Sequence, residues 1–509
     1  MGRMQFAARN IFFGFSGHVV HVLLGFISRT VFIYTLGATY LGVNGLFTNV
    51  LSVLSLAELG IGTAMNFSLY KPAAEKDVEK IKALMNLYRR SYRIVAFVVT
   101  VLGFALVPFL HRIIKDPVNI GFNELRVYYL IFLFNTVSSY FVAYKYSIVN
   151  AEQRNYIQTN IHTITVSITI FVQIIVLVLL KNFLLYLLVG ALIGLVQKFL
   201  VNTYLNRLYP YLLEKNVCKL PEQETETISK NIKALIYHKI GDISVHQTDN
   251  IIISAFINVT TVGLISNYNL LITSISGFIN IIFHSVVSGF GNLIATENRE
   301  KQYFLFRVYR FVGFWLYGFA SVAFFVLLTP FIQLWIGQSM VIEHSVISLI
   351  LLNYYFMGHR IIINNFKTAA GIFDADKFIA LVQAFVNLVL SVVLVQVMGL
   401  AGVYVGTVVS GLVSTFTRPV IVYRSAFQKN PLDYYKDSLK YLLVVFAALV
   451  PLELIKHFLW INKTAAEFIS LLFLVVLITN GMFFFFSRKR DEFCYLLTII
   501  AERFHGRGK

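Results

Sequence analysis

One apolar stretch near the start of the chain decides the fold: Ile11 to Leu36, which reads IFFGFSGHVVHVLLGFISRTVFIYTL. Its 26 residues are enough to cross a bilayer as a tilted helix. Three ionisable residues, His18, His21 and Arg29, interrupt it. His18 and Arg29 are eleven positions apart, which places them within about 20° of each other on one helix face. Because an arginine in hydrocarbon costs from about 3 to over 10 kcal/mol, we expect this face to line a polar cavity.

The composition of the whole chain is that of a polytopic membrane protein. Of its 509 residues, 57% are hydrophobic and only 13% are charged, which is too little charge for a soluble fold of this length. The apolar runs are continuous rather than alternating, so a transmembrane β-barrel is excluded. The net charge of +18 comes from basic residues between the apolar runs. That distribution follows the positive-inside rule and argues against nucleic acid as a partner.

The motifs of common enzymes are absent from the sequence. It holds no phosphate-binding G-x-x-x-x-G-K-[ST] loop, no serine elbow, no H-E-x-x-H and no cysteine cluster. Cys218 and Cys494 fall in segments expected to be cytoplasmic, where two single thiols predict neither a disulfide nor a metal site. We also expect no removable N-terminal signal. The sequence therefore predicts a protein that is not an enzyme and has no cofactor, with coupling to a proton or sodium gradient left open.

Apolar spans follow one another along the chain with short connections. Every second connection is basic and the others are nearly uncharged, so we expect both termini in the cytoplasm. We identify about fourteen spans from their length and hydrophobicity. They lie near 11–36, 41–68, 92–111, 126–149, 157–180, 183–206, 233–257, 262–292, 305–335, 344–366, 378–398, 400–423, 439–459 and 464–487.

An internal repeat joins the two halves of the chain. The segment 79–89, EKIKALMNLYR, matches 300–310, EKQYFLFRVYR, at five of eleven positions, where chance gives fewer than about one. The same offset pairs 39–42, TYLG, with 260–263, TTVG. Both copies start on the same side of the membrane, which predicts a parallel repeat of two six-span halves.

The repeat predicts the domain organisation. We expect an all-α protein in which two six-helix lobes surround a central cavity, with two extra helices at the C-terminal end. The expected segments are an N-terminal lobe over 1–210, a cytoplasmic linker over 211–232, a C-terminal lobe over 233–430, the last two spans over 431–487, and a basic cytoplasmic tail over 488–509.

The first span has a counterpart in the seventh, which begins the second half. Residues 233–257 form the least apolar span and carry His238, Asp242, His246 and Asp249 at spacings of four, four and three. These spacings place the four side chains in one stripe on a helix. In the simplest arrangement the two stripes face each other across the cavity.

The charged candidates each have a functional and a structural interpretation. The planar guanidinium of Arg29 suits phosphate or carboxylate oxygens, although it could instead reach the membrane edge. Asp242 and Asp249 are candidate proton or cation sites, or internal counter-ions to Arg29 and Lys239. Glu58 lies among small residues, where it is either a packed, hydrogen-bonded group or a third ion-coupling candidate.

The other candidates are assigned to the substrate cavity. A membrane histidine can also be hydrogen-bonded within the bundle, and basic residues at a cytoplasmic helix end can serve as topology determinants. The spacing of the histidines does not predict a metal site. The residues assigned to the cavity beside Arg29 are His18, His21, His246, Asn250, Arg360 and Lys367.

Four features of the opening residues carry a family resemblance: Arg29, the 36–42 turn LGATYLG, the 56–60 run LAELG and the 70–72 motif YKP. With them the chain resembles bacterial polysaccharide-export flippases of the Wzx type. That family belongs to the multidrug/oligosaccharidyl-lipid/polysaccharide exporter superfamily. The resemblance implies two six-helix lobes around a central, often cationic cavity. It also implies that an undecaprenyl-pyrophosphate-linked oligosaccharide is turned from the cytoplasmic to the outer leaflet, with Arg29 at the pyrophosphate.

We therefore predict an alternating-access flippase of the cytoplasmic (inner) membrane that serves capsule, O-antigen or related envelope polysaccharide synthesis. Its expected partners are the lipid-linked oligosaccharide and membrane lipids, with a glycan polymerase and glycosyltransferases as further candidates. One alternative is a drug or cation antiporter of the same superfamily, whose cavity should be acidic and aromatic. A second is a membrane glycan-modifying enzyme, for which His359 is the candidate catalytic residue.

Overall fold

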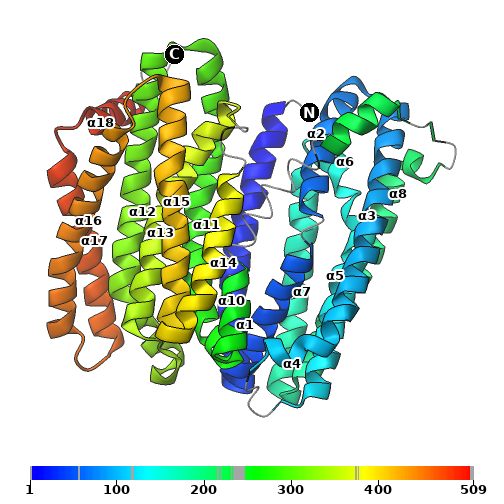
Figure 1. The fold of residues 1–509 in the computed structure, drawn as a ribbon, viewed down its shortest axis with the longest axis horizontal. Coiled ribbons are helices and arrows are strands. Elements are labelled where there is room, and N and C mark those ends of the chain that lie inside the picture. The colour runs from blue at the N-terminus through cyan, green and yellow to red at the C-terminus, as the bar shows by residue number, and fades with distance from the viewer. Residues whose placement is uncertain are drawn as a thin grey trace. The chain divides into compact units, whose positions relative to one another are not determined.

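The structure, a computed structural model, describes residues 3–55, 58–115, 120–214, 217–218, 220–230, 232, 247–372, 375 and 378–504. The regular secondary structure of these residues is helical, and no strand occurs among them (Figure 1). The all-α prediction is confirmed. The helices form two compact units, Met1–Ser266 and Asn267–Lys509, and each is described by itself.

The chain is a multi-pass membrane protein. Within the described residues, twelve helices are long and apolar enough to cross a membrane. Only structures that satisfy their own backbone hydrogen bonds can span hydrocarbon, and a continuous helix does so. Many of the large apolar side chains point outward, such as Phe171 at 66% and Phe199 at 70% exposure. In a bilayer these side chains contact lipid.

The first unit begins with an unusually long helix that is followed by shorter ones (Figure 1). Its helices are α1 (Arg3–Leu54), α2 (Leu59–Glu75), α3 (Val78–Leu106), α4 (Leu110–Ile113), α5 (Phe122–Ala143), α6 (Tyr146–Ala151), α7 (Asn155–Leu180), α8 (Phe183–Leu208), η3 (Pro210–Leu213), α10 (Thr248–Phe256) and the start of α11 (Val259–Thr296).

A single kink interrupts α1, at the place where the sequence predicts the first connection. Gly37 has φ 82° and ψ −178°, while the residues on both sides are helical. A positive φ is open to glycine and strained for other residues, so glycine is required here. The expected loop of residues 37–40 is therefore a sharp bend between two helical stretches.

Two of the fourteen expected spans do not match any one of the twelve helices that are long enough to cross a membrane. The second, 41–68, is divided, because α1 ends at Leu54 and α2 begins at Leu59. The seventh, 233–257, lies outside the described residues up to 246, and its remaining part is α10. The other expected spans each correspond to one helix of the structure.

The segments paired by the repeat contact each other inside the first unit. The hydroxyls of Thr39 and Thr260 are 3.0 Å apart. A Cβ on Gly42 would lie 1.9 Å from the carbonyl oxygen of Val259, and a Cβ on Gly263 would lie 2.0 Å from that of Ala38. Equivalent positions of the repeat thus meet reciprocally, as a two-fold relation between the copies requires. Only glycine lets the two backbones approach this closely.

The second unit is built around α12 (Arg299–Ile336), which packs against α13 (His344–Ala369), α16 (Leu432–Leu459) and α17 (Ala465–Ser487). Phe314 of α12 stacks on Tyr441 of α16 at 4.3 Å between ring centroids, and it lies 4.7 Å from the ring of Phe483 of α17. The two helices that the sequence places outside the repeat, α16 and α17, therefore share a hydrophobic core with α12 of the second repeat copy. After the rest of α11, the helices are α12 (Arg299–Ile336), α13 (His344–Ala369), α14 (Ile379–Met398), α15 (Leu400–Val422), α16 (Leu432–Leu459), α17 (Ala465–Ser487) and α18 (Asp491–Phe504).

The tail helix α18 is attached to α12 by a buried ion pair. Arg307 Nη2 lies 2.5 Å from Glu492 Oε1, and Glu492 is only 1% exposed. Beside this pair, Phe493 stacks on Trp315 with ring centroids 5.8 Å apart. A buried carboxylate that loses its partner typically costs about 3–5 kcal/mol. The pair therefore holds a helix that the sequence alone predicts only as a surface tail.

In the Arg307→Ala variant, the buried carboxylate of Glu492 has lost its ion-pair partner for as long as α18 stays packed on α12. We therefore expect α18 to detach from α12 in this variant. Limited trypsin digestion of the detergent-purified protein should cut after Arg488 to Arg490 several times faster than in the wild type. The matched control is Lys301→Ala on the same helix, which removes only the exposed ion pair with Glu297 and should cost about 0.5 kcal/mol or less. Equal digestion rates of the two variants would contradict this role for the ion pair.

Candidate functional site

Arg29 lies in the first unit on α1, between the histidines and the kink. Its guanidinium Nη1 donates a hydrogen bond to Ser266 Oγ at 2.7 Å. Ser266 belongs to α11 and in turn donates to the backbone oxygen of Gly263 at 2.7 Å. The arginine is therefore held beside the reciprocal glycine contact by a neutral hydroxyl. A planar guanidinium with five N–H donors is suited to bind the oxygens of an anion.

One histidine of α1, His21, lies beside α7. The His21 ring lies 6.4 Å from the ring of His162 on α7, between centroids, and His18 is half-buried. The two helices approach closely, since a Cβ on Gly17 would lie 2.8 Å from Thr163 Oγ1. Sequence reasoning did not select His162. A polar run on α7, from Asn155 to Thr165, is the signal that could have drawn attention to it.

The predicted stripe of the seventh span is described only in part. Asp242 and His246, together with His238, lie outside the described residues. Asp249 and Asn250 lie in the first turn of α10 and are half-buried. Because α10 packs against α1, these two candidates belong to the same unit as Arg29.

Glu58 lies immediately before α2, within a cluster of tyrosines. Tyr92 Oη donates to Glu58 Oε1 at 3.2 Å, and the ring of Tyr92 packs edge-on against Tyr88 and Tyr140. The Oη of Tyr140 donates to Ser55 Oγ at 2.7 Å. This environment matches the packed, hydrogen-bonded interpretation of Glu58, because phenol donors satisfy a half-buried carboxyl group.

Arg360 and Lys367 lie on α13 of the second unit, and both are buried, at 6% and 7% exposure. Arg360 Nη2 donates to Asn353 Oδ1 at 3.1 Å. Its Nη1 is buried with no hydrogen-bond partner among the described residues. A Cβ on Gly411 of α15 would lie 2.3 Å from that Nη1, so the glycine leaves the space that the guanidinium occupies.

A second arginine adds to the positive charge around Arg360. Arg418 lies two helical turns after Gly411 on α15, and its charge acts on Arg360. No carboxylate among the described residues forms an ion pair with Arg360. A buried guanidinium whose charged neighbour is a second guanidinium makes this part of the second unit a candidate anion site.

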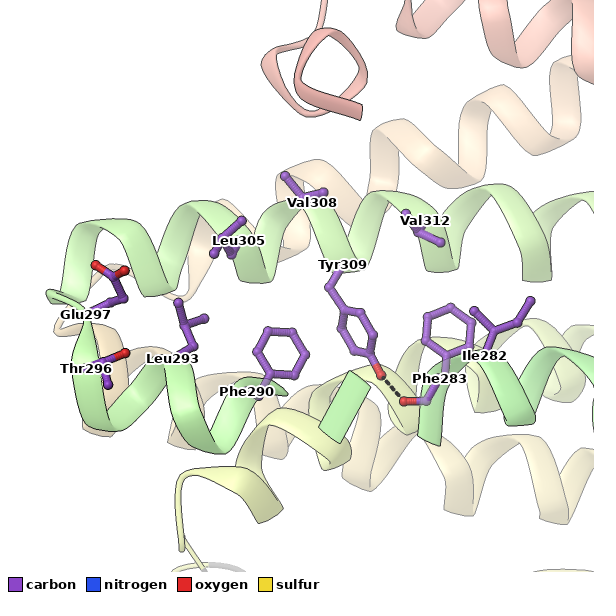
Figure 2. A pocket seen from close by; sticks show the side chains of 10 residues that line it. All are labelled: Ile282, Phe283, Phe290, Leu293, Thr296, Glu297, Leu305, Val308, Tyr309 and Val312. Atoms are coloured by element: carbon purple, nitrogen blue, oxygen red, sulfur yellow. Dashed lines mark hydrogen bonds between the residues drawn. The ribbon is translucent and has the colours of Figure 1, made fainter. Parts of the chain in front are cut away.

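One cavity of the second unit does not involve any predicted site residue. It has a volume of about 390 Å³ and lies between α11 and α12. Figure 2 shows Tyr309 reaching across it, where its Oη donates to the backbone oxygen of Phe283 at 3.1 Å. The lining is almost entirely apolar: Ile282, Phe283, Phe290, Leu293, Thr296, Glu297, Leu305, Val308, Tyr309 and Val312. A charged head group would not be stable there.

The arrangement of helices is one that solved membrane transporters and flippases share. The chain aligns with a structure entitled "Lipid II flippase MurJ, inward closed conformation" at a TM-score of 0.67 and 14% identity, over 95% of this chain and 99% of that one. It also aligns with an inward-facing multidrug resistance MATE family transporter of the MOP superfamily, at a TM-score of 0.57 and 15% identity, over 80% and 96%.

A third similar structure is that of the MATE multidrug transporter DinF-BH, with a TM-score of 0.59 and 13% identity over 84% of this chain and 98% of that chain. At such low identities the likeness establishes the fold. No protein-family model matches the sequence, and no curated protein matches it.

Proposed function

We propose that this protein is a flippase of the MOP superfamily, of the Wzx type, that turns an anionic lipid-linked oligosaccharide across the membrane. Two classes of transporter share the fold, because its similar structures include a lipid II flippase and multidrug transporters. The chemistry of the candidate residues in each unit therefore has to decide between an anionic lipid and a cationic drug.

The observation that supports the proposal most directly is the burial of the Arg360 guanidinium beside a neutral hydrogen-bond partner. Its guanidinium is 6% exposed, and one of its nitrogens has no hydrogen-bond partner among the described residues. Another nitrogen donates to the neutral Asn353, and no described carboxylate forms an ion pair with it. A buried charge without a counter-charge costs several kcal/mol. A bound phosphate or carboxylate supplies the missing negative charge, whereas a cationic drug would add to the repulsion.

Arg29 supports the same conclusion in the first unit. Its Nη1 donates a hydrogen bond to the hydroxyl of Ser266 at 2.7 Å. A guanidinium binds a diphosphate in bidentate fashion, through two parallel hydrogen bonds. In the proposal Arg29 binds the pyrophosphate of an undecaprenyl-pyrophosphate-linked repeat unit. In the second unit, taken by itself, Arg360 and Lys367 are the residues suited to bind an anionic group.

The remaining parts of the proposal follow from this substrate. A glycan and a diphosphate cannot cross hydrocarbon unaided, so the protein provides a polar path while the lipid tail stays in the bilayer. The protein works by alternating access in the cytoplasmic membrane, with both termini in the cytoplasm. His18, His21 and Asn250 contact the substrate, and Asp249, with Asp242, couples the movement to a proton or sodium gradient.

The test is a flipping assay on the full chain in proteoliposomes. A fluorescent polyprenyl-pyrophosphate oligosaccharide should become accessible to a membrane-impermeant quencher much faster than in protein-free vesicles. Efflux of a lipophilic cationic dye from the same vesicles should equal the protein-free rate. Dye efflux without movement of the glycolipid would instead identify a drug antiporter.

The enzymatic alternative lacks structural support at its candidate residue. His359 is 6% exposed, and its ring packs against Tyr355 at 4.7 Å between centroids. Its Nε2 is buried without a partner among the described residues. A histidine that transfers an acyl group must reach both donor and acceptor, so we do not propose such an activity.

A further inference from the structure

A cavity lined by basic residues lies in the first unit, and Arg29 is not among its lining residues. Its volume is about 320 Å³. It lies where α3 begins and where α5 and α8 end, which is the side that carries the basic connections. The lining includes three basic side chains and no acidic one: Arg89, Arg93, Tyr140, Phe141, Tyr144, Lys145, Asn202, Asn206, Leu212 and Leu213.

Lys145 forms the buried wall of this cavity, with 4% of its surface exposed. Its ammonium donates to Asn202 Oδ1 at 2.6 Å and also to Asn206 Oδ1, both on α8. Amide oxygens satisfy hydrogen bonds but leave the charge uncompensated. Burial, and then the nearby charge of Arg89, lower the pKa of Lys145 to about 8. The site thus contains a buried ammonium group that is hydrogen-bonded to two amides and forms no ion pair with a carboxylate of the described residues.

Arg89 and Arg93 add two further charges from one face of α3. They are four residues apart, so their side chains lie one above the other on the helix, and both are exposed. Neither forms an ion pair with a described carboxylate. Like charges placed this close repel each other unless an anion lies between them.

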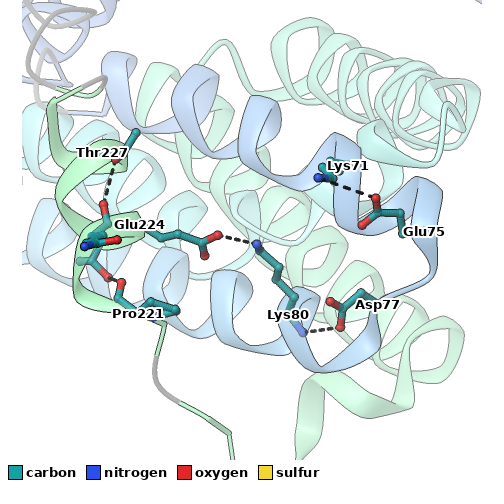
Figure 3. Close-up of polar contacts among 9 residues, drawn as sticks. Lys71, Glu75, Asp77, Lys80, Pro221, Glu224 and Thr227 are labelled. Atoms are coloured by element: carbon teal, nitrogen blue, oxygen red, sulfur yellow. Dashed lines mark hydrogen bonds and ion pairs between the residues drawn. The ribbon is translucent and has the colours of Figure 1, made fainter.

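Two other basic residues of α3, Lys80 and Lys82, form ion pairs with glutamates. Lys80, two to three turns earlier on α3, lies 2.5 Å from Glu224, as Figure 3 shows. The Nζ of Lys82 lies 2.5 Å from Glu79 Oε1 and 2.7 Å from Glu214 Oε2. Acidic side chains thus pair with basic residues at the start of α3, whereas among the described residues none lines the cavity that follows.

The rim of the cavity is apolar and exposed. Phe141 is 54% exposed and Leu213 is 61% exposed, and both line the cavity beside the basic groups. Exposed apolar side chains at the end of membrane helices contact acyl chains. A ligand that fits this combination has an anionic head and an apolar tail, and basic pockets between membrane helices bind such head groups.

We propose that this cavity binds the phosphodiester of an anionic membrane phospholipid, with Lys145, Arg89 and Arg93 as its basic ligands and the acyl chains along Phe141 and Leu213. The proposal is independent of the transported substrate. A lipid bound here links α3, α5 and α8 at one end of the unit. A free phosphate ion shares the head-group chemistry, so the experiment must separate the two sources.

The experiment measures lipid binding by the delipidated full chain in detergent, by native mass spectrometry and thermal shift. The probes are phosphatidylglycerol, phosphatidylcholine with the same acyl chains, and inorganic phosphate. Because Lys145 is buried, its replacement could also harm folding, so the test variant is Arg89→Gln/Arg93→Gln. The matched control is Arg90→Gln/Arg207→Gln, which removes two exposed arginines of α3 and α8 that do not line the cavity.

Phosphatidylglycerol should bind the wild type and the control pair alike, and phosphatidylcholine should bind much more weakly. The test pair should lose about thirtyfold in affinity for phosphatidylglycerol, a factor of about five for each basic residue near the membrane surface. Equal losses in the two pairs, or equal binding of the two lipids, would overturn the proposal. If inorganic phosphate binds as well as the lipid does, the site is a free-anion site and the lipid assignment is wrong.

Discussion

Replacing Arg29 with glutamine should lower the flipping rate of the pyrophosphate-linked substrate by at least about a hundredfold, while the amount of folded protein stays within about twofold of the wild type. Two charge-assisted hydrogen bonds to a diphosphate contribute about 1.5–3 kcal/mol each, and glutamine cannot replace them. The fold should tolerate the change, because Ser266, which accepts a hydrogen bond from Arg29, keeps its own hydrogen bond to the Gly263 carbonyl. The measurement is the proteoliposome assay with the fluorescent glycolipid.

Three companion variants separate charge from structure. Arg126→Gln removes an exposed arginine at the start of α5 and should leave flipping unchanged. Ser266→Ala removes the hydrogen bond to Arg29 but keeps its charge, so it should cost only a few-fold in rate, since one neutral partner is worth about 1 kcal/mol. Arg29→Lys should restore part of the rate, as a point charge without the bidentate geometry. Wild-type flipping in the glutamine variant would show that Arg29 does not bind the substrate.

Alanine at either Gly42 or Gly263 should strongly destabilise the first unit. The new Cβ would lie 1.9 Å from the Val259 carbonyl oxygen in one case and 2.0 Å from the Ala38 carbonyl oxygen in the other. Both obstacles are backbone atoms of helices, which cannot rotate away as a side chain would. Overpacking of this kind costs about 3 kcal/mol, which corresponds to a fall in Tm of about 6–12 °C for a unit of this size.

Gly42→Ala and Gly263→Ala should lower the Tm by nearly equal amounts. The two glycines occupy equivalent positions of the repeat, and each lies against a backbone carbonyl of the other's helix. The Tm of the two alanine variants should therefore fall by similar amounts. Gly45→Ala is the matched control on α1, since its Cβ would lie 3.7 Å from Val262 Cγ1, an ordinary contact. It should be neutral or slightly stabilising, because alanine is the better helix former. Thermal unfolding of the purified variants measures all three, and an unchanged Tm for Gly42→Ala would disprove the close contact.

Much of the fold could be predicted because its signals are local. The length of each apolar run determines whether a helix can span the membrane, and all but two of the expected spans correspond to one spanning helix. Two of the expected spans are exceptions. The span 41–68 is broken between Leu54 and Leu59, next to a glutamate flanked by small residues, and most of 233–257 lies outside the described residues. The kink at Gly37 was expected as a connection and not as a bend within a helix.

The candidate site was predictable only at the level of single residues. Ionisable groups inside apolar runs are rare enough to select Arg29, Arg360 and Glu58 without a structure. Their partners could not be selected this way. Ser266, Asn353 and Gly411 are ordinary residues of apolar helices. Nothing in their local sequence distinguishes them from their neighbours, and Arg29 and Ser266 are 237 positions apart.

The amino-acid sequence by itself determined that this is a multi-pass helical membrane protein with an internal repeat, because span length, charge content and repeat identity are properties of short segments. Only the tertiary structure decided that the repeat-related glycines touch, that Glu58 is bonded to a tyrosine, that Arg360 is buried without a described counter-charge, and that Lys145 is held by two asparagines. Each of these facts depends on which helices pack together. Packing brings distant residues within a few ångströms of each other, and no local pattern encodes that choice.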